Sequence, residues 1–281
     1  MTVVIDGKQT AKEIRAELRE EAQKLGVVPG LCVILVGDDP ASAIYVRNKA
    51  RACKDAGFYS RTIKLPAETA REELLACIRE QNADPQIHGI LVQLPLPKHL
   101  DEQEILAAID PAKDADGFLP VSAGKLLLGQ KAPVACTPQG CLELLKRSGV
   151  PMEGAHAVVV GRSNIVGKPM ALLLLRENGT VTVAHSRTKD LKEVTKRADI
   201  LVVAVGKPKM ITAEYVKEGA VVIDVGIHRN EENKLCGDVD FDSVEPVCSA
   251  ITPVPGGVGP MTIAMLMNNC LESVSLQAVR G

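Results

Sequence analysis

Short apolar runs alternate with helical segments along most of this chain, and this alternation is the feature that most restricts its fold. Residues 31–36 and 89–94 are apolar almost throughout, and residues 42–56, between them, have helical spacing. Strands that are apolar on both faces are typical of parallel sheets covered by helices. Aromatic residues make up only 2% of the chain, so aliphatic side chains must build the core. The pattern predicts an α/β protein with parallel sheets.

The 281 residues predict two domains, because a domain usually holds roughly 100–200 residues. An irregular segment rich in Gly, Pro and Asp, residues 110–138, separates two series of strands and helices. The second series runs from about residue 154 to residue 225. Residues 260–274 have the pattern of a long helix, which could return to pack on the first domain.

Composition argues against several classes of protein. The net charge of −2 gives no reason to expect nucleic acid or a membrane surface as a partner. No apolar run reaches the roughly 20 residues of a membrane span, and the first residues do not resemble a secretory signal. The eight cysteines include no Cys-x-x-Cys pair, which favours reduced thiols over disulfides and predicts no metal site. We therefore expect a cytoplasmic protein.

The segment GRSNIVG, residues 161–167, follows an apolar strand and precedes a helical pattern. This is the context of a dinucleotide-binding turn, in which helix N–H groups face a pyrophosphate. Gly161 permits the tight turn and Gly167 permits close packing of the helix. Ser163 stands where the usual second glycine would be, so an ordinary strand-to-helix connection without a ligand is the alternative.

The end of the next strand indicates which dinucleotide binds. An NAD site needs a carboxylate about 20 residues after the first glycine. Here the sequence is HSRT, residues 185–188, with no carboxylate before Asp190. Ser186, Arg187 and Arg162 would suit a 2′-phosphate, which predicts NADP rather than NAD. The alternative is that both arginines are ordinary surface charges.

A candidate reaction site begins with Tyr45 and Lys49, one turn apart on a predicted helix. A lysine beside a phenol is a candidate for proton transfer; alternatively, Lys49 extends along the surface and Tyr45 is half-buried. Gln93 is the one polar residue in the apolar strand 89–94. A buried amide needs a hydrogen-bond partner, which could be Lys49 or the backbone.

Two further segments are unusual. Asp116, in KDADGF, could accept hydrogen bonds from an amino-heterocycle or could be a turn residue beside Gly117. The segment TPVPGGVGPMT, residues 252–262, combines stiff prolines with glycines that let other atoms approach the backbone. It could line a ligand site or form a structural elbow.

Six motifs occur in a specific order: YVRNK (45–49), GILVQLPLP (89–97), KDADGF (113–118), CTP (136–138), VGRSNIVGKP (160–169) and TPVPGGVGPMT (252–262). Together they resemble the bifunctional methylenetetrahydrofolate dehydrogenase / methenyltetrahydrofolate cyclohydrolase family over essentially the full chain. The resemblance implies a folate-binding α/β domain at 1–138, a Rossmann NADP-binding domain at 139–261, and a cleft between them. It also implies a homodimer, and a last helix at about 262–281 that packs on the first domain.

The implied activity belongs to one-carbon metabolism and supplies purine biosynthesis. It oxidises 5,10-methylenetetrahydrofolate to the 5,10-methenyl form with NADP, and then adds water to give 10-formyltetrahydrofolate. By position, Lys49 would be central to the water step, Gln93 would orient it, Tyr45 would position folate and Asp116 would hold the pterin.

The remaining implied contacts fall into two groups. Arg162, Ser163 and Ser186 would contact NADP, with Thr137 and Ile227 near the nicotinamide. Residues 253–259, which include Pro253, Gly256 and Gly257, would lie between folate and nicotinamide.

The chain departs from the family pattern at Ser122 and His228, where Asn is usual. Both positions lie close to implied binding surfaces. Two other readings remain: a shikimate-type dehydrogenase of small acids, and an NADP-binding scaffold without activity. The motif around Gln93 and the segment 252–262 argue against the first. The presence of Lys49 and Gln93 in their expected motifs argues against the second.

Overall fold

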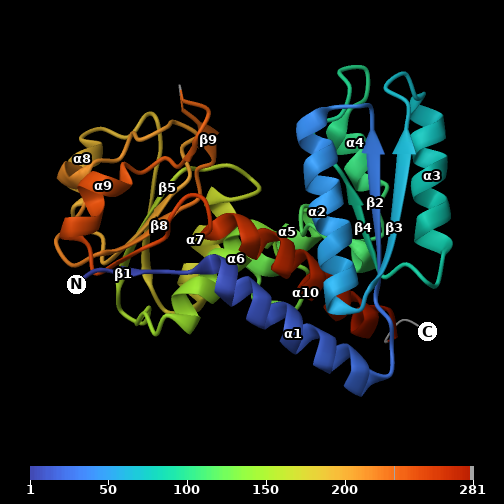
Figure 1. The fold of residues 1–281 in the computed structure, drawn as a ribbon, viewed down its shortest axis with the longest axis horizontal. Coiled ribbons are helices and arrows are strands. Elements are labelled where there is room, and N and C mark those ends of the chain that lie inside the picture. The colour runs from blue at the N-terminus through green and yellow to red at the C-terminus, as the bar shows by residue number, and fades with distance from the viewer. Residues whose placement is uncertain (231, 279–281) are drawn as a thin grey trace. The chain divides into compact units, whose positions relative to one another are not determined.

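The computed structural model describes residues 1–230 and 232–278, and it divides into two compact units. One unit comprises residues 1–11 and 135–262, and we call it the six-stranded unit. The other comprises residues 12–134 and continues from residue 263, and we call it the three-stranded unit. Figure 1 shows the chain coloured from the N-terminus to the C-terminus.

The six-stranded unit has a sheet of order β1-β11-β8-β7-β5-β6, in which every neighbouring pair is parallel. This confirms the predicted α/β class and the parallel sheet. The strands are β1 (Val3–Val4), β5 (His156–Val160), β6 (Thr180–Ala184), β7 (Ile200–Val203), β8 (Val221–Asp224) and β11 (Ala250–Ile251). Helices α6 (Cys136–Arg147), α7 (Gly167–Arg176) and α8 (Leu191–Thr195) connect or flank them. The core is aliphatic, as the composition predicts, with Val158, Leu201 and Val222 fully buried.

Several short elements of this unit were not expected from the sequence. They are the antiparallel pair β9 (His228–Arg229) and β10 (Leu235–Cys236), helix α9 (Phe241–Val244), and the 3-10 turns η2 (Ala213–Tyr215) and η3 (Glu245–Val247). Elements of two to four residues contain too few positions to show a period, so tertiary contacts decide them.

The three-stranded unit has a parallel sheet of order β3-β2-β4. Its strands are β2 (Gly30–Val36), β3 (Tyr59–Leu65) and β4 (Gly89–Val92). Helix α2 (Pro40–Ala56) contacts β2 and β3 (Figure 1). Buried residues of α3 (Arg71–Ala83) and α4 (Glu102–Ala107) share a core cluster with Cys32 and Ile34 of the central strand. The sheet therefore has the helical cover that its apolar strands require.

The segment 110–138 is more ordered than its composition suggests, and its prediction as an irregular connection is wrong. It contains the 3-10 turn η1 (Pro111–Lys113), the helix α5 (Pro120–Leu127) and the start of α6 at Cys136. Pro120 occupies the first turn of α5, where a missing N–H costs nothing. The glycine within α5 and its short length conceal the helical pattern in the sequence.

The two longest helices each carry residues of both units: α1 (Gly7–Leu25) and α10 (Val258–Ala278). In the three-stranded unit, Asn269 Nδ2 of α10 donates to Ala115 O at 2.9 Å and to Val134 O at 2.8 Å. Residues 1–11, which the sequence assigns to the domain 1–138, group instead with the six-stranded unit, because β1 pairs with β11. The predicted last helix extends to residue 281, and residues 279–281 lie outside the described part of the chain.

None of the helices in the described ranges is both long and apolar enough to cross a bilayer.

Candidate active site and dinucleotide cavity

The turn between β5 and α7 has the geometry that the GRSNIVG segment predicts. Gly161 has φ +139°, and a Cβ placed on it would lie 2.4 Å from Ala204 O. A Cβ on Gly167 would lie 2.2 Å from Gly161 O, so the helix packs against the turn only with glycine there. Ser163 Oγ accepts from the N–H groups of Val166 at 3.2 Å and Gly167 at 3.4 Å, at the start of α7. The serine at the second glycine position therefore orders the turn.

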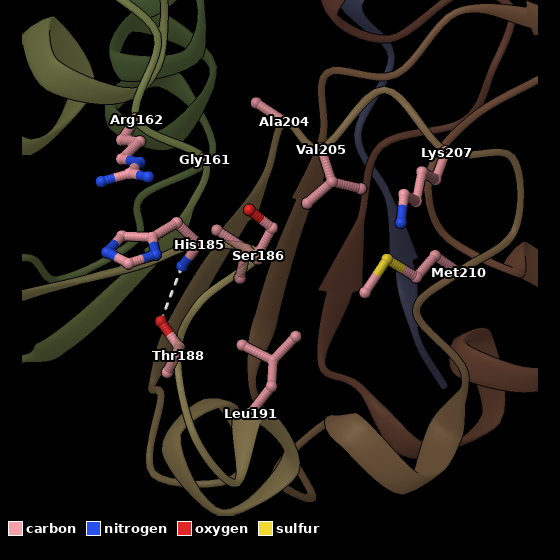
Figure 2. A pocket seen from close by; sticks show the side chains of 11 residues that line it. Gly161, Arg162, His185, Ser186, Thr188, Leu191, Ala204, Val205, Lys207 and Met210 are labelled. Carbon is pink, nitrogen blue, oxygen red and sulfur yellow. Dashed lines mark hydrogen bonds between the residues drawn. The ribbon is translucent and has the colours of Figure 1, made fainter.

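A cavity of about 320 Å³ lies beside this turn, within the roughly 300–1,000 Å³ of ligand pockets. Figure 2 shows Arg162 and His185 on one side of it and Lys207 and Met210 on the other, with Ser186 between them. Of the residues predicted to bind the cofactor, Gly161, Arg162 and Ser186 line the cavity; its full lining is Val160, Gly161, Arg162, His185, Ser186, Thr188, Leu191, Ala204, Val205, Lys207 and Met210.

Arg187 does not join this lining. Its side chain is exposed, and its backbone N–H donates to His185 Nδ1 at 3.2 Å. The same turn is closed by His185 N, which donates to Thr188 Oγ1 at 2.8 Å (Figure 2). The structure thus separates the two arginines that the sequence grouped together, and places Arg162 alone at the cavity.

Among the lining residues that were not predicted as site residues, His185 and Lys207 carry ionisable side chains. His185 directly follows β6 and Lys207 lies in the loop after β7. Ligands bind at the carboxyl ends of parallel strands, so the residues after each strand were the available signal.

The proline- and glycine-rich loop lines a second, smaller cavity of about 150 Å³. Pro253, Gly256, Gly257 and the side chain of Ile227, which is 47% exposed, all contribute to its lining. Gly257 N donates to Pro253 O at 2.9 Å, which closes the loop on itself. The structure therefore brings together four of the residues predicted near folate and nicotinamide.

Thr137 lies outside the linings of these two cavities. It is in the first turn of α6, and its Oγ1 is 3.0 Å from Thr262 Oγ1 in α10. Both hydroxyls belong to the six-stranded unit.

Lys49 and Gln93 are brought together in the three-stranded unit. Lys49 Nζ donates to Gln93 Oε1 at 3.0 Å, and Gln93 Nε2 donates to Leu94 O at 2.7 Å. The side-chain amide of Gln93 therefore bonds to both of the partners that the sequence allowed, Lys49 and the backbone. Gln93 is half-buried and follows β4, which ends at Val92, so its prediction as a buried strand residue is wrong. The strand ends there because the chain turns at Pro95 and Pro97.

Asp116 lies near this pair, since the charge of Lys49 acts on its carboxyl. Burial raises the pKa of Asp116 to about 6; the charge of Lys49 lowers this pKa and that of Asp114 raises it. A half-buried carboxylate on which an ammonium charge acts can accept hydrogen bonds from a polar heterocycle and still exchange a proton near neutral pH.

The loop that carries Asp116 is held by a second carboxylate. Asp114 is buried, and it accepts from the N–H groups of Gly117 at 3.0 Å, Phe118 at 3.2 Å and Leu119 at 3.0 Å. Ser122 Oγ donates to the same carboxylate at 2.7 Å. Ser122 is 2% exposed, so this departure from the family pattern supports the loop from inside.

Tyr45 lies on α2, one turn before Lys49, and is 47% exposed. Asp39 caps this helix by accepting from Ser42 N at 2.7 Å, and Gly57, with φ +74°, ends it. The tyrosine ring is thus available for stacking, and Tyr45, Lys49, Gln93 and Asp116 all belong to one unit.

Family models match both parts of the chain. Residues 5–116 match the catalytic domain of tetrahydrofolate dehydrogenase/cyclohydrolase, and residues 135–278 match its NAD(P)-binding domain. The chain belongs to the tetrahydrofolate dehydrogenase/cyclohydrolase family. The catalytic model includes Tyr45, Lys49, Gln93 and Asp116, and the NAD(P)-binding model includes the cavity beside Gly161.

Relatives within the tetrahydrofolate dehydrogenase/cyclohydrolase family are similar over nearly their whole length. The chain is 60% identical to the bifunctional protein FolD of Agathobacter rectalis over 277 residues, which is 98% of this chain and 99% of that protein. FolD from Campylobacter jejuni, whose crystal structure is known, is 47% identical in sequence to this chain. The two structures superpose with a TM-score of 0.96, and the match covers 99% of this chain and 100% of that one. FolD of Trypanosoma brucei, solved with NADP cofactor and an inhibitor, is 41% identical to this chain. Its TM-score is 0.92, and the match covers 100% of this chain and 99% of that one.

Shikimate 5-dehydrogenase from Thermus thermophilus is more distant. It is 17% identical, with a TM-score of 0.55 and coverage of 88% of this chain and 99% of that one. This likeness shows a common fold alone, and the comparisons support the folate reading over the shikimate reading.

Proposed function

We propose that this protein oxidises 5,10-methylenetetrahydrofolate to 5,10-methenyltetrahydrofolate with NADP, and then hydrolyses the product to 10-formyltetrahydrofolate. The observation that carries the proposal is the contact of Lys49 with Gln93 beside Asp116, in a chain of this family. The two steps make different demands. Hydride transfer needs mainly alignment of donor and acceptor. Addition of water needs a group that moves protons.

The proposed roles follow from the contacts of each side chain. Lys49 handles the proton of the water step, and Gln93 holds its ammonium through Oε1. Asp116 accepts hydrogen bonds from the pterin, and the exposed ring of Tyr45 stacks on the folate. Because Gln93 is itself anchored on Leu94 O, the amide presents a fixed oxygen to the lysine.

The cavity beside Gly161 is the proposed NADP site. Arg162 supplies a guanidinium and Ser186 a hydroxyl for a 2′-phosphate, and none of the described residues that line the cavity carries a carboxylate to favour a 2′-hydroxyl. The turn between β5 and α7, at the N-terminal end of that helix, would lie beside the pyrophosphate. When bound at this site, NADP would supply the hydride acceptor for the folate.

We further propose that Pro253, Gly256, Gly257, Ile227 and Thr137 form the surfaces between folate and nicotinamide. The loop that carries Pro253, Gly256 and Gly257 has little side-chain bulk, which suits close approach of two flat ligands.

The decisive assay mixes purified protein with 5,10-methylenetetrahydrofolate and either NADP or NAD, and follows reduced cofactor and methenyl product separately by absorbance. Reduced cofactor with NADP and little methenyl accumulation is the expected result. Stoichiometric methenyl product would contradict the hydrolysis step. Absence of turnover by folded protein with either cofactor would contradict the whole proposal and favour an inactive NADP-binding protein.

A homodimer and a cytoplasmic location complete the proposal. The dimer is supported by the family resemblance, and sedimentation at micromolar concentration tests it: a monomer at all concentrations would contradict it. None of the eight cysteines, all of which lie in the described residues, takes part in a disulfide, which fits a reducing compartment. Cell fractionation tests the location.

A further inference from the structure

One wall of the cavity beside Gly161 is formed by the loop that follows β7. Val205 and Lys207 of this loop line the cavity, together with Arg162 (Figure 2). The loop leaves the sheet at the carboxyl end of its strand, which is where ligands of parallel sheets bind. The shape of this wall therefore bears directly on what the cavity holds.

A buried carboxylate behind the wall organises the loop. Asp238 is fully buried, and its Oδ2 accepts from Val205 N at 2.7 Å and Gly206 N at 3.0 Å. Its Oδ1 accepts from Lys207 N at 2.8 Å. Three successive N–H groups converge on one anion because Gly206 takes φ +70°, which glycine adopts without strain. The backbone donors of the wall thus face the protein, and the side chains of Val205 and Lys207 remain for a ligand.

His228 is the fourth partner of this carboxylate. Its Nε2 lies 2.7 Å from Asp238 Oδ1, and its side chain is 21% exposed. The acceptor is a carboxylate, so Nε2 carries the proton in this contact. His228 is the position where the family pattern usually has Asn, which also offers a side-chain N–H donor. His228 and the usual Asn therefore have in common a side-chain N–H group that can donate to Asp238.

A second buried carboxylate fixes the backbone of Asp238. Asp224 accepts from Gly226 N at 2.9 Å, Asp238 N at 3.0 Å and Val239 N at 2.9 Å. A Cβ on Gly237 would lie 1.8 Å from Asp224 Oδ2, so this close packing requires glycine. The loop after β7, the loop after β8 and the segment around Asp238 are consequently joined at one point.

We propose that Asp238, held by His228, is a positioning residue for cofactor binding. It does not line the cavity; it fixes the wall that carries Val205 and Lys207. The inference rests on the proposed function in that the ligand of the cavity is NADP. Asp238 and His228 should therefore affect the affinity for NADP and leave the KM for methylenetetrahydrofolate unchanged.

The test is isothermal titration calorimetry of the full chain with NADP alone, without folate. His228→Ala removes the donor, His228→Asn keeps one, and Asp240→Asn is the matched control. Asp240 lies two residues from Asp238, but its carboxylate pairs with Lys209 at the surface. We expect His228→Ala to weaken NADP binding about ten-fold, the size expected for loss of a hydrogen bond to a charged group. The other two variants should stay within about two-fold of the unchanged protein.

A second readout separates positioning from general damage. The KM for methylenetetrahydrofolate at saturating NADP should not change in His228→Ala, because only the NADP side is affected. Equal NADP affinity of folded His228→Ala and the unchanged protein would overturn the inference, and so would equal losses in His228→Ala and His228→Asn.

Hydrogen exchange keeps the inference testable if His228→Ala does not fold. In the unchanged protein, NADP should slow exchange of the N–H groups of Val205, Gly206 and Lys207. No change at these three amides, with NADP bound, would overturn the positioning role alone. Failure of the unchanged protein to bind NADP would overturn the proposed cofactor and the inference with it.

Discussion

Lys49 Nζ lies 3.0 Å from Gln93 Oε1, although the two residues are 44 positions apart in the chain. The contact links helix α2 to the residue that follows the edge strand β4. It gives the ammonium a fixed hydrogen-bond acceptor in the unit that contains Asp116 and Tyr45.

We expect Lys49→Ala to lower the hydrolysis of methenyltetrahydrofolate by at least about 100-fold, the lower range for loss of a general acid–base group. Dehydrogenase activity should fall less, because hydride transfer depends on alignment. Stopped-flow absorbance of methenyl decay measures the first effect. Lys54→Ala is the control, because Lys54 is exposed on the same helix. Hydrolysis at the unchanged rate in Lys49→Ala would remove the lysine from the mechanism.

Gln93→Ala should also impair hydrolysis, because the ammonium of Lys49 loses its acceptor. The double variant Lys49→Ala/Gln93→Ala should be scarcely worse than Lys49→Ala alone, since residues that act as a unit are not additive. Steady-state rates of the two single variants and the double variant give the coupling. Fully additive losses would show that Gln93 acts independently of the lysine.

Asp116 predicts a pH dependence of folate binding. Its pKa is raised to about 6, chiefly by burial, so the carboxylate takes up a proton as the pH falls from 7 to 5. The charged form accepts hydrogen bonds from the pterin, so the KM for folate should rise over this range. Asp116→Asn should have a higher KM at pH 7 and lose the dependence. An unchanged pH profile in Asp116→Asn would contradict the assignment.

The carboxyl of Asp116 should also make the stability of the folded protein depend on pH, in the direction opposite to its effect on folate binding. Its pKa is higher in the folded protein than the ordinary value of 3.8, so the folded state holds the proton more tightly. The free energy of unfolding should therefore decrease as the pH rises from about 4 to about 6. Asp116→Asn should be more stable than the unchanged protein above pH 6, as measured by urea unfolding at pH 4 and pH 7. A smaller difference at pH 7 than at pH 4 would contradict this sign.

Ser122→Ala should destabilise the protein by about 1–3 kcal/mol, because the buried carboxylate of Asp114 loses a donor at 2.7 Å. The melting temperature should fall by a few degrees. Ser275→Ala, at an exposed position of α10, is the control and should change little. The KM for folate should also rise in Ser122→Ala, since Asp114 holds the loop that carries Asp116. Equal melting temperatures of the two variants would contradict the role of Ser122.

Arg162→Ala should weaken NADP binding by about ten-fold or more and leave NAD binding nearly unchanged, because only NADP carries the 2′-phosphate. Arg187→Ala is the matched control, since its side chain is exposed and does not line the cavity. Calorimetric titration with both dinucleotides measures the four affinities. A larger effect in Arg187→Ala would reverse the assignment of the two arginines.

Local patterns were sufficient to predict the turn at Gly161 and Gly167, because strand, turn and helix follow one another within a short segment. The same holds for β2, β4 and β7, which are continuous apolar runs, whereas the two residues of β11 were too few to predict a strand. In contrast, α5 escaped prediction because eight residues with an internal glycine give a weak period.

The non-local contacts of the site depend on strand order. Lys49 meets Gln93 because β2 lies between β3 and β4, and the sequence offered the backbone as an equal partner for the amide. Arg162 and Arg187 looked equivalent, since each is an arginine beside a strand end, and only the turn at His185 separates them. The carboxylate of Asp238 behind the cavity wall left no signal, because its partners come from two separate segments, residues 205–207 and His228.

The path of the chain between the two units constrains how this protein can evolve. The units share three covalent junctions, after residues 11, 134 and 262, and two of these lie inside the helices α1 and α10. A genetic fusion at any single junction would transfer an incomplete unit: without residues from 263 onward, Ala115 O and Val134 O would lose the amide of Asn269. Each unit is built from two separate stretches of the chain, so recombination at a single point cannot transfer either unit whole.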